Sequence, residues 1–211
     1  MDDAELAVAD ITEVGPDAVA IDLESPTDFD ARPGQFVKLT FEDDGGEISR
    51  FYTISSPDVV DTFEITVEID PEGDAGPMLA ALEAGDTVTV SGPFGSSYYE
   101  DESRVLVIAG GPGVGPAVGI AERALDDGGE AAVVYRDESP IHQERLNALR
   151  ERGAVVSVLA PEEDLSAAVA DALTDGTQVF VYGFADFLDD ATAAIADAGG
   201  EPDAAKVENF G

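Results

Sequence analysis

Residues 105–116 read VLVIAGGPGVGP, an apolar run that ends in a cluster of glycines. The run predicts a buried strand, and the residues that follow the glycines predict the start of a helix. Glycines at such a turn let backbone N–H groups approach a pyrophosphate closely, and the amino terminus of the helix favours its negative charge. The spacing differs from the usual G-x-G-x-x-G pattern, so this turn alone is equally consistent with nucleotide binding and with a tight loop.

The alternation of apolar runs and amphipathic segments continues from this turn to the end of the chain. We predict strands at residues 104–109, 130–135, 154–159, 178–182 and 206–210, and helices at residues 115–126, 141–152, 165–173 and 186–198. Five strands with four intervening helices are typical of a doubly wound parallel sheet, which makes this half an α/β domain.

The first half of the chain has short β-rich runs between turn signals. We predict strands at residues 18–23, 35–41, 50–55, 62–69 and 87–91, turns at residues 32–34, 43–46 and 84–86, and one helix at residues 76–83. Many short strands with regular turns predict an antiparallel β-barrel. Because no low-complexity linker separates the halves, we expect two domains that pack directly, residues 1–101 and residues 102–211.

The charge balance is extreme. The chain has 46 Asp and Glu residues against 10 Lys and Arg, a formal net charge of -36, while 44% of its residues are hydrophobic and sufficient for a globular core. Self-repulsion of this size destabilises a compact state in dilute buffer, whereas molar salt shortens the Debye length to about 3 Å. We therefore expect a halophilic protein with hydrated salt cations at its surface; the alternative is an acidic protein adapted to ordinary salt.

The same features limit the expected partners and location. Nucleic acids and anionic membranes are poor partners for so acidic a surface. No apolar run approaches the roughly 20 residues that span a bilayer, and the start MDDAE lacks the basic residues of a secretory signal. We expect no membrane insertion and a cytoplasmic protein in a cell with a salty interior.

The residue types that are absent or rare exclude several chemistries. Without cysteine, the chain can have no disulfide, thiolate nucleophile or cysteine-held iron–sulfur cluster. His142 is the only histidine, which excludes a histidine-rich metal centre. Because it stands at a predicted helix start, we interpret it as a surface residue and expect no histidine-containing catalytic triad. No calcium-loop pattern is present, so we predict no metal site. Redox chemistry in this chain must come from a cofactor.

The first half contains its most specific motif at residues 50–57, RFYTISSP. Arg50 is one of only ten cationic residues, and arginine pairs bidentately with phosphate. Tyr52 can lie flat against a ring system, and Thr53 offers a hydroxyl to a heteroatom. Without neighbouring motifs, Tyr52 and Thr53 would more simply be strand residues of a hairpin.

Three motifs in this order resemble the ferredoxin-NAD(P)H reductase superfamily over nearly the whole chain: Arg-x-Tyr-Thr at residues 50–53, Gly-Pro-Phe-Gly at residues 92–95 and the glycine-rich turn at residues 110–116. The resemblance implies a flavin-dependent oxidoreductase with a flavin-binding barrel and a nicotinamide-binding α/β domain. By this resemblance Arg50 would neutralise the flavin pyrophosphate, and Tyr52 would pack on the isoalloxazine or ribityl region. Thr53 would hydrogen-bond near flavin N5, with Phe51 beside it in the cofactor site.

The superfamily's next element, Gly-x-x-Ser/Thr before a short helix, aligns with Gly73-Asp74-Ala75-Gly76, where the hydroxyl is missing. Backbone N–H groups at this helix start, in the stretch that contains Gly73, Gly76, Pro77 and Met78, would still bind phosphate. The resemblance favours FAD over FMN, because the FAD-binding members use both this helix start and the arginine.

The glycine-rich turn of the second half would receive the nicotinamide dinucleotide, through Gly110, Gly111, Gly113, Val114, Gly115 and Pro116. Arg136 stands where superfamily members contact the adenosine portion; alternatively it is a surface arginine that offsets Asp137 and Glu138. The acidic stretch PEED at residues 161–164 disfavours the extra phosphate of NADPH, so we expect NADH rather than NADPH.

Two further positions follow from the resemblance. Superfamily members carry Cys-Gly-x-x beside the nicotinamide, where this chain reads Val181-Tyr182-Gly183-Phe184. Hydride transfer does not require the thiol, because the reacting atoms belong to the two cofactors. The ending Glu208-Asn209-Phe210 resembles the superfamily's Glu-x-Phe, which places Phe210 close to the flavin; packing of a last strand is the alternative. The predicted catalytic residues are therefore Thr53, Tyr182 and Phe210.

The resemblance implies that hydride passes between NAD(P)H and FAD and that electrons go on to a ferredoxin or similar separate carrier. Two alternatives remain at this point. One is a flavin-binding electron-transfer subunit of a multicomponent enzyme, and the other is a reductase of free flavin.

Overall fold

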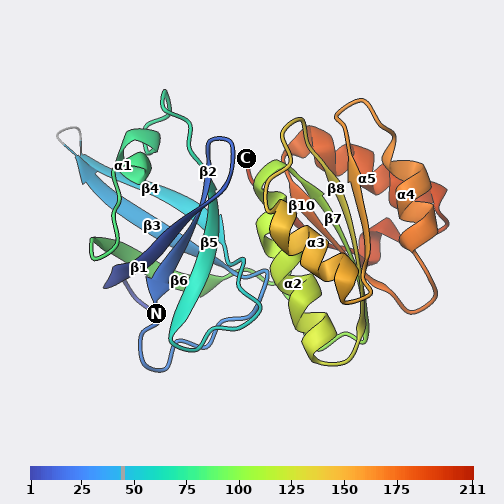
Figure 1. Ribbon diagram of the computed structural model, residues 1–211, viewed down its shortest axis with the longest axis horizontal. Helices are drawn as coiled ribbons and strands as arrows, with labels where there is room; N and C mark the ends of the chain where they lie inside the picture. Colours follow the sequence, from blue (N-terminus) through green and yellow to red (C-terminus); the bar gives the residue numbers. More distant parts are fainter. Residues whose placement is uncertain (44–45) are drawn as a thin grey trace.

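The protein contains one antiparallel and one parallel β-sheet, in a computed structural model that describes residues 1–43 and 46–211 (Figure 1). The antiparallel sheet has the strand order β4-β3-β6-β1-β2-β5. Its elements are β1 (Ala4–Gly15), β2 (Ala18–Glu24), β3 (Phe36–Asp43), β4 (Gly46–Thr53), β5 (Thr62–Glu68), the short helix α1 (Gly76–Ala80) and β6 (Thr87–Phe94). An antiparallel bridge between Ile54 and Ile65 links the end of β4 to β5, so the two edges of the sheet meet and form the barrel. The predicted turn at residues 43–46 lies partly outside the described residues.

The barrel is filled by the apolar residues of alternating strand positions. Val37 and Leu39 of β3 are fully buried, as are Phe63 and Ile65 of β5, and all four belong to one core. Successive side chains of a strand point to opposite faces, which is why this alternation predicts the barrel strands well.

Strand β1 is not among the strands that the sequence predicts. It pairs antiparallel with both β2 and β6, so it is a central strand of the sheet. Its register with β2 shifts between Val8 and Asp10, and a bulge of this kind interrupts the alternation of buried and exposed residues. Leu6 and Val8 are buried, but the pattern breaks directly after them, which hides a strand of 12 residues.

The parallel sheet has the strand order β11-β10-β7-β8-β9. Its strands are β7 (Arg104–Gly110), β8 (Glu130–Arg136), β9 (Val155–Leu159), β10 (Gln178–Gly183) and β11 (Lys206–Asn209). The helices are α2 (Val114–Asp126), α3 (Gln143–Glu151), α4 (Leu165–Ala172) and α5 (Ala185–Asp197), with short 3-10 turns at Gly111–Gly113 and Pro202–Ala204. The predicted fold class, an antiparallel barrel followed by a five-stranded parallel sheet with helices, is confirmed.

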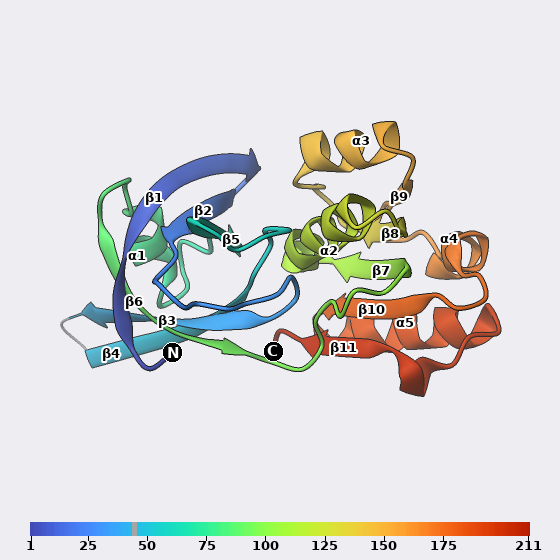
Figure 2. The same cartoon turned by 90° about the horizontal axis from the view of Figure 1, so that it is seen from below.

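Helices cover both faces of the parallel sheet (Figure 2). Val105 and Val107 of β7 pack in one core with residues of α2 and α3. Leu106 and Ile108 point to the opposite face and pack with residues of α4 and α5. Both faces of β7 are therefore buried, which explains its continuous apolar sequence. None of the helices in residues 1–43 and 46–211 has the length and apolarity needed to cross a bilayer.

Helix α2 packs directly against the barrel (Figures 1 and 2). A Cβ atom at Gly119 would lie 2.5 Å from the carbonyl oxygen of Ser55, and one at Gly115 would lie 2.5 Å from Oγ1 of Thr66. Neither position has room for a side chain, so these glycines allow the close approach. The carboxyl terminus of the chain lies between the two sheets in both views. The division at residues 101 and 102 falls in the segment between β6 and β7 and stays a prediction.

Candidate cofactor-binding site

A cavity of about 290 Å³ lies where the carboxyl ends of the parallel strands meet the barrel. The barrel contributes seven lining residues, Arg50, Phe51, Tyr52, Thr53, Thr66, Glu68 and Asp70. The second half contributes four, Pro112, Pro116, Phe184 and Phe210. The cavity thus brings together the Arg-Phe-Tyr-Thr motif, both prolines of the glycine-rich turn and the predicted Phe210.

Strand β4 supplies the densest group of side chains. Thr53 is 8% exposed, whereas Phe51 is 63% exposed and packs edge-on against Phe36 at 5.6 Å between ring centroids. Burial raises the pKa of Tyr52 to about 12, so its phenol stays neutral. The Arg50 guanidinium forms an ion pair with Asp74, with Nη2 3.1 Å from Oδ2, and its side chain remains 44% exposed. This arginine is accessible to an additional anion.

The predicted phosphate-binding stretch lies next to Arg50 but does not line the cavity. Asp74, inside this stretch, is the ion-pair partner of Arg50. The Gly73 N–H donates to the Asp70 carbonyl at 3.1 Å, and a Cβ atom at Gly76 would lie 1.6 Å from the same oxygen. Close packing against Asp70 therefore accounts for Gly76. The roles of Gly73, Gly76, Pro77 and Met78 toward phosphate stay predictions.

The glycine-rich turn packs against protein at most of its positions. A Cβ atom would meet the Phe187 ring at Gly110, the Tyr182 carbonyl oxygen at 2.4 Å at Gly113, and Thr66 at Gly115. Val114 is fully buried in the core, so its side chain faces no ligand space. Gly111 is the least crowded glycine of the turn, because a Cβ atom there would meet only Oδ2 of Asp137, at 3.9 Å, and its φ is left-handed at +56°. Close packing within the second half at Gly110 and Gly113, and against the barrel at Gly115, explains much of the glycine content that suggested nucleotide binding.

Three other predicted residues lie outside the cavity. Tyr182 is fully buried, its hydroxyl donates to the Ser97 carbonyl, and burial raises the pKa of this tyrosine well above its usual value. The Gly183 carbonyl accepts a hydrogen bond of 3.0 Å from the Phe210 N–H. Arg136 is 2.6 Å from a carboxylate oxygen of Asp190 and 5.3 Å from the centre of the Phe187 ring. The surface interpretation of Arg136 named Asp137 and Glu138 as its partners, but its ion pair is with Asp190.

A wider cavity of about 550 Å³ adjoins the first one and shares Phe51, Thr53 and Phe210 with it. Glu208 lines this second cavity. Burial raises the pKa of Glu208 to about 7. Glu208, the acid of the Glu-x-Phe ending, is therefore a weak acid. It lies beside the cavity of about 290 Å³ lined by Phe51, Tyr52, Phe184 and Phe210, which we call the aromatic cavity.

The raised pKa of Glu208 makes stability depend on pH. The folded chain holds this proton up to about pH 7, whereas the unfolded carboxyl releases it near the ordinary value of 4.5. Glu208 therefore destabilises the fold fully above pH 7 and not at all below the unfolded value. We expect Glu208→Gln to raise the urea midpoint at about pH 8 and to leave it unchanged at about pH 4. An equal change at both pH values would contradict the assignment.

The interpretation of His142 as a surface residue is wrong. Its side chain is only 3% exposed, and its Nε2 lies 2.8 Å from Oγ1 of Thr66. Burial, followed by the charge of Arg145, lowers the pKa of His142 to about 3, so the ring is neutral. The sequence around His142 has the pattern of a helix start, which favours a surface position. Burial of a side chain between two packed domains produces no hydrophobic periodicity in the sequence, so the sequence could not show that His142 is buried.

Sequence reasoning also missed several residues of the cavity wall. Thr66, Glu68 and Asp70 come from β5 and the residues after it, while Pro112 and Phe184 follow the ends of β7 and β10. Burial raises the pKa of Glu68, and the charge of Asp137 adds to this shift. The spacing of Thr66 and Glu68 by two residues on a strand is the available signal, because such residues share a face.

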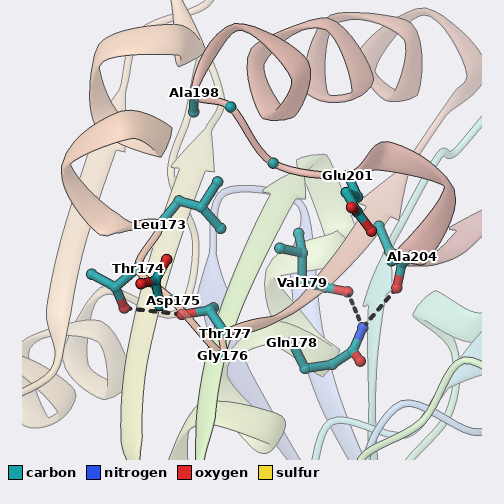
Figure 3. A pocket seen from close by; sticks show the side chains of 13 residues that line it. Leu173, Thr174, Asp175, Gly176, Thr177, Gln178, Val179, Ala198, Glu201 and Ala204 are labelled. Atoms are coloured by element: carbon teal, nitrogen blue, oxygen red, sulfur yellow. Dashed lines mark hydrogen bonds between the residues drawn. The ribbon is translucent and has the colours of Figure 1, made fainter.

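A separate cavity of about 440 Å³ lies at the opposite end of the parallel sheet (Figure 3). It is formed by residues 173–179 before and in β10 and by the segment after α5, and Gln178 donates there to the carbonyl of Ala204 at 3.1 Å. No aromatic or cationic residue is part of its lining among the described residues. Ligands of doubly wound sheets bind at the carboxyl ends of the strands, so the aromatic cavity is the candidate site.

The residues of the aromatic cavity fit a flavin. Tyr52 and Phe51 offer ring surfaces on the barrel side, and Phe184 and Phe210 stand on the other side with their ring centroids 6.0 Å apart. Arg50 offers a cation to a pyrophosphate. Thr53 and Thr66 add hydroxyls to a largely apolar wall, which is the usual composition of a cofactor site.

Comparison with known proteins agrees with this geometry. The family of the oxidoreductase FAD-binding domain matches residues 5–99. A glycine betaine monooxygenase reductase subunit from Chromohalobacter salexigens is 38% identical over 107 residues, which are 49% of this chain and 29% of that protein. The toluate 1,2-dioxygenase electron transfer component of Pseudomonas putida is 26% identical over 157 residues, 70% of this chain and 46% of that protein. The chain thus spans less than half the length of these relatives.

Solved structures show the same fold. An Amycolatopsis cytochrome P450 reductase superposes with a TM-score of 0.83 at 22% identity and covers 99% of this chain and 70% of its own. A ferredoxin NADP+ reductase from Neisseria gonorrhoeae, with bound FAD and NADP, has a TM-score of 0.80 at 18% identity over the full length of both chains. At this identity the likeness shows the two-domain architecture.

Proposed function

We propose that the chain is an NAD(P)H-dependent flavoprotein reductase of the ferredoxin-NAD(P)H reductase superfamily, because the oxidoreductase FAD-binding domain matches residues 5–99 and because the chain is similar to the relatives named above. Residues 1–101 would form the flavin-binding domain and residues 102–211 the nicotinamide-binding domain. The observation that carries the proposal is the aromatic cavity, whose Arg50, Tyr52 and Thr53 lie inside the FAD-binding region.

A bound flavin accepts a hydride from a nicotinamide and can release electrons singly. The chain's own residues bind and orient it. Tyr52 and Phe210 would confine the ring from the two halves of the molecule, Arg50 would neutralise the pyrophosphate, and Thr53 would hold a ring heteroatom by its hydroxyl. The proposed catalytic residues are Thr53 and Phe210, which line the cavity; Tyr182, the third predicted catalytic residue, is buried outside the cavity and would act as a positioning residue that supports the wall from the core.

NADH is the proposed hydride donor. The loop after β9 carries Glu162, Glu163 and Asp164, which would repel the additional phosphate of NADPH. The Asp164 carboxylate caps α4 by accepting a hydrogen bond of 2.9 Å from the Ser166 N–H, so the loop presents a fixed negative charge. Arg136, the cation near this loop, is already paired with Asp190.

A separate protein is the proposed electron acceptor. The similar proteins are a reductase subunit of a monooxygenase and an electron transfer component of a dioxygenase, which suggests a ferredoxin-type carrier or an oxygenase component as the partner. A flavin subunit without nicotinamide chemistry and a reductase of free flavin are the competing possibilities.

An anaerobic titration with NADH, followed at the flavin absorbance, tests the proposal. The chain is loaded with FAD in molar KCl, and one equivalent of NADH is expected to bleach the flavin, with NADPH acting more slowly. Dithionite serves as the control that shows the bound flavin can be reduced. A flavin that dithionite bleaches and NADH leaves oxidised would contradict the reductase and identify a subunit that depends on a partner. FAD that leaves the protein on desalting would identify a reductase of free flavin.

The high-salt adaptation also stays a proposal, and the ion pairs support it. In the described part of the chain, nine of the ten cationic residues pair with only twelve of the 46 carboxylates. Most acidic residues therefore have no protein cation beside them, and hydrated salt cations would balance their charge. A cytoplasm with a high salt concentration would provide these cations.

We expect the thermal midpoint to fall when KCl is lowered from molar to millimolar concentration. The Debye length grows from about 3 Å to about 30 Å over this range, so carboxylates that were screened from one another begin to repel. A loss of about 3 kcal/mol corresponds to roughly 10 °C for a chain of this size. Circular dichroism melting curves measure the change, and an unchanged midpoint would show that the chain does not depend on salt.

A further inference from the structure

Thr66 connects the aromatic cavity to the interface between the two halves. It lies on β5, its side chain is 5% exposed, and it lines the cavity. Its Oγ1 is 2.8 Å from Nε2 of His142, which belongs to the second half. A single side chain of the barrel therefore touches both the ligand space and the opposite domain.

His142 is held rigidly for this contact. It adopts a left-handed conformation, with φ of 54°, directly before α3, and its N–H donates to the Val14 carbonyl at 2.8 Å. Its own carbonyl accepts from the Leu146 N–H at 3.0 Å. A left-handed conformation is uncommon for a residue with a side chain and persists where the surroundings enforce it. The backbone on both sides thus fixes where the imidazole points.

The hydroxyl of Thr66 has little freedom on the domain side. The first turn of α2 covers it so closely that a Cβ atom at Gly115 would come within 2.5 Å of Oγ1. His142 occupies another direction. A threonine hydroxyl has one donor and two acceptor positions, so capacity remains after the bond to the imidazole. Because Thr66 also lines the cavity, we infer that a bound ligand uses this remaining capacity.

The neutral state of His142 suits this role. A neutral imidazole nitrogen is either a donor or an acceptor, and its partner hydroxyl takes the complementary role. If Nε2 accepts, the Thr66 hydroxyl donates its proton to the ring and has only lone pairs left for the cavity; if Nε2–H donates, the hydroxyl keeps its proton and one lone pair. The hydrogen bond therefore sets the polarity, as well as the orientation, of one group in the cavity wall.

We propose that His142 is a positioning residue of the cofactor site, which fixes the Thr66 hydroxyl so that it meets the bound flavin ring with a defined polarity. The inference rests on the proposed function, because it needs a flavin in the cavity. It assigns to the second domain a direct influence on the electronic surroundings of the ring, across the interface and without contact between His142 and the flavin. A shift of α3 relative to the barrel would break the hydrogen bond between His142 and Thr66. The visible absorption bands of the bound flavin would then change.

A double-mutant cycle tests the proposal. Thr66→Val removes the hydroxyl and keeps the shape, and His142→Phe removes the ring nitrogens. Each is expected to weaken FAD binding about tenfold, as the loss of one hydrogen bond would, and to displace the visible flavin bands. The double variant should show no further change, because both substitutions interrupt one unit. Thr66→Ser, which keeps the hydroxyl, should retain the wild-type bands and affinity.

Leu146→Ala is the matched control. Leu146 lies on α3, is 1% exposed and does not line the cavity, so its truncation lowers the thermal midpoint and leaves the flavin bands in place. Effects of Thr66→Val and His142→Phe that add in the double variant, or wild-type bands in either one, would overturn the proposal. If His142→Phe fails to fold, wild-type bands in Thr66→Val alone overturn it.

The proposed function and the role of His142 can be overturned separately. If the wild-type chain binds no FAD, the proposed function fails and the inference with it. If the wild-type chain binds FAD and Thr66→Val or His142→Phe does not differ from it, the inference fails and the proposed function stands.

Discussion

Replacing Arg145 by Met is expected to lower the free energy of unfolding by about 3–5 kcal/mol, the cost of removing one partner from a buried ion cluster. Arg145 on α3 forms ion pairs of 2.6 Å with Glu64 of the barrel and Glu122 of α2, and it also donates to the Ser55 carbonyl at 2.8 Å. Burial alone would lower the pKa of this arginine, but the hydrogen bonds and charges of both carboxylates raise it. Its loss leaves two carboxylates facing each other at the domain interface.

Urea denaturation in molar KCl measures this effect. Side chains of Arg145, Glu64 and Glu122 are only 22%, 19% and 16% exposed, so salt screens them less than a surface pair. Arg152→Gln is the matched control. Arg152 directly follows the same helix and pairs with Asp126, and the side chains of this pair are 39% exposed for Arg152 and 51% exposed for Asp126. The control should cost less than about 1 kcal/mol.

A triple variant separates the charge effect from lost packing. Replacing Glu64 and Glu122 by Gln together with Arg145→Met removes the unpaired carboxylates, and stability should recover in part. If Arg145→Met were no more damaging than Arg152→Gln, the cluster would not hold the two halves together.

Replacing Arg50 by Ala is expected to weaken FAD binding about ten- to hundredfold. A hydrogen bond to a charged group contributes roughly 1.5–3 kcal/mol, and arginine can form two of them with a pyrophosphate. Arg50 is the one cation in the lining of the cavity among the described residues, and the acidic chain provides no nearby replacement.

Fluorescence titration with FAD in molar salt measures the affinity of the Arg50 variant. Arg32→Gln is the control, because Arg32 is also a barrel arginine with an exposed ion pair, to Asp101, and does not line the cavity. The control should bind FAD as the wild type does. Equal affinities of wild type and Arg50→Ala would remove Arg50 from the site.

The fold was largely predictable, because its determinants are local. Residues 104–109 and 130–135 form two strands that are covered on both faces. Every buried position in these runs is apolar, and each run is followed by a helix. Helix α1 ends at Ala80, three residues before the predicted end, in a segment that is only five residues long. Strand β1 could not be predicted because its bulge interrupts the alternation of its side chains.

The site was predictable where its residues are contiguous. Arg50 to Thr53 follow one another on β4 and reach the cavity together. Phe184 and Pro112 reach it from loops at the ends of different strands, so their place depends on the strand order and on the packing of the two halves. The amino-acid composition of the chain cannot show that Phe184 and Pro112 reach the cavity.

The glycine-rich turn and the two buried side chains show a second limit of sequence reasoning. A glycine that faces a ligand and one that faces another backbone look the same in a sequence, and Gly113 and Gly115 face protein. Tyr182 and His142 have polar groups that are satisfied in the interior, by Ser97 and Thr66. Both bonds cross the interface between the halves, and long-range contacts of this kind leave no spacing signal.

The central claim is that the cavity between the two halves holds one flavin. The most direct measurement is the visible spectrum of the wild-type chain after incubation with FAD in molar KCl and removal of free FAD by gel filtration. We predict flavin bands at one FAD per chain. A colourless protein whose folding is shown by its circular dichroism would contradict the account.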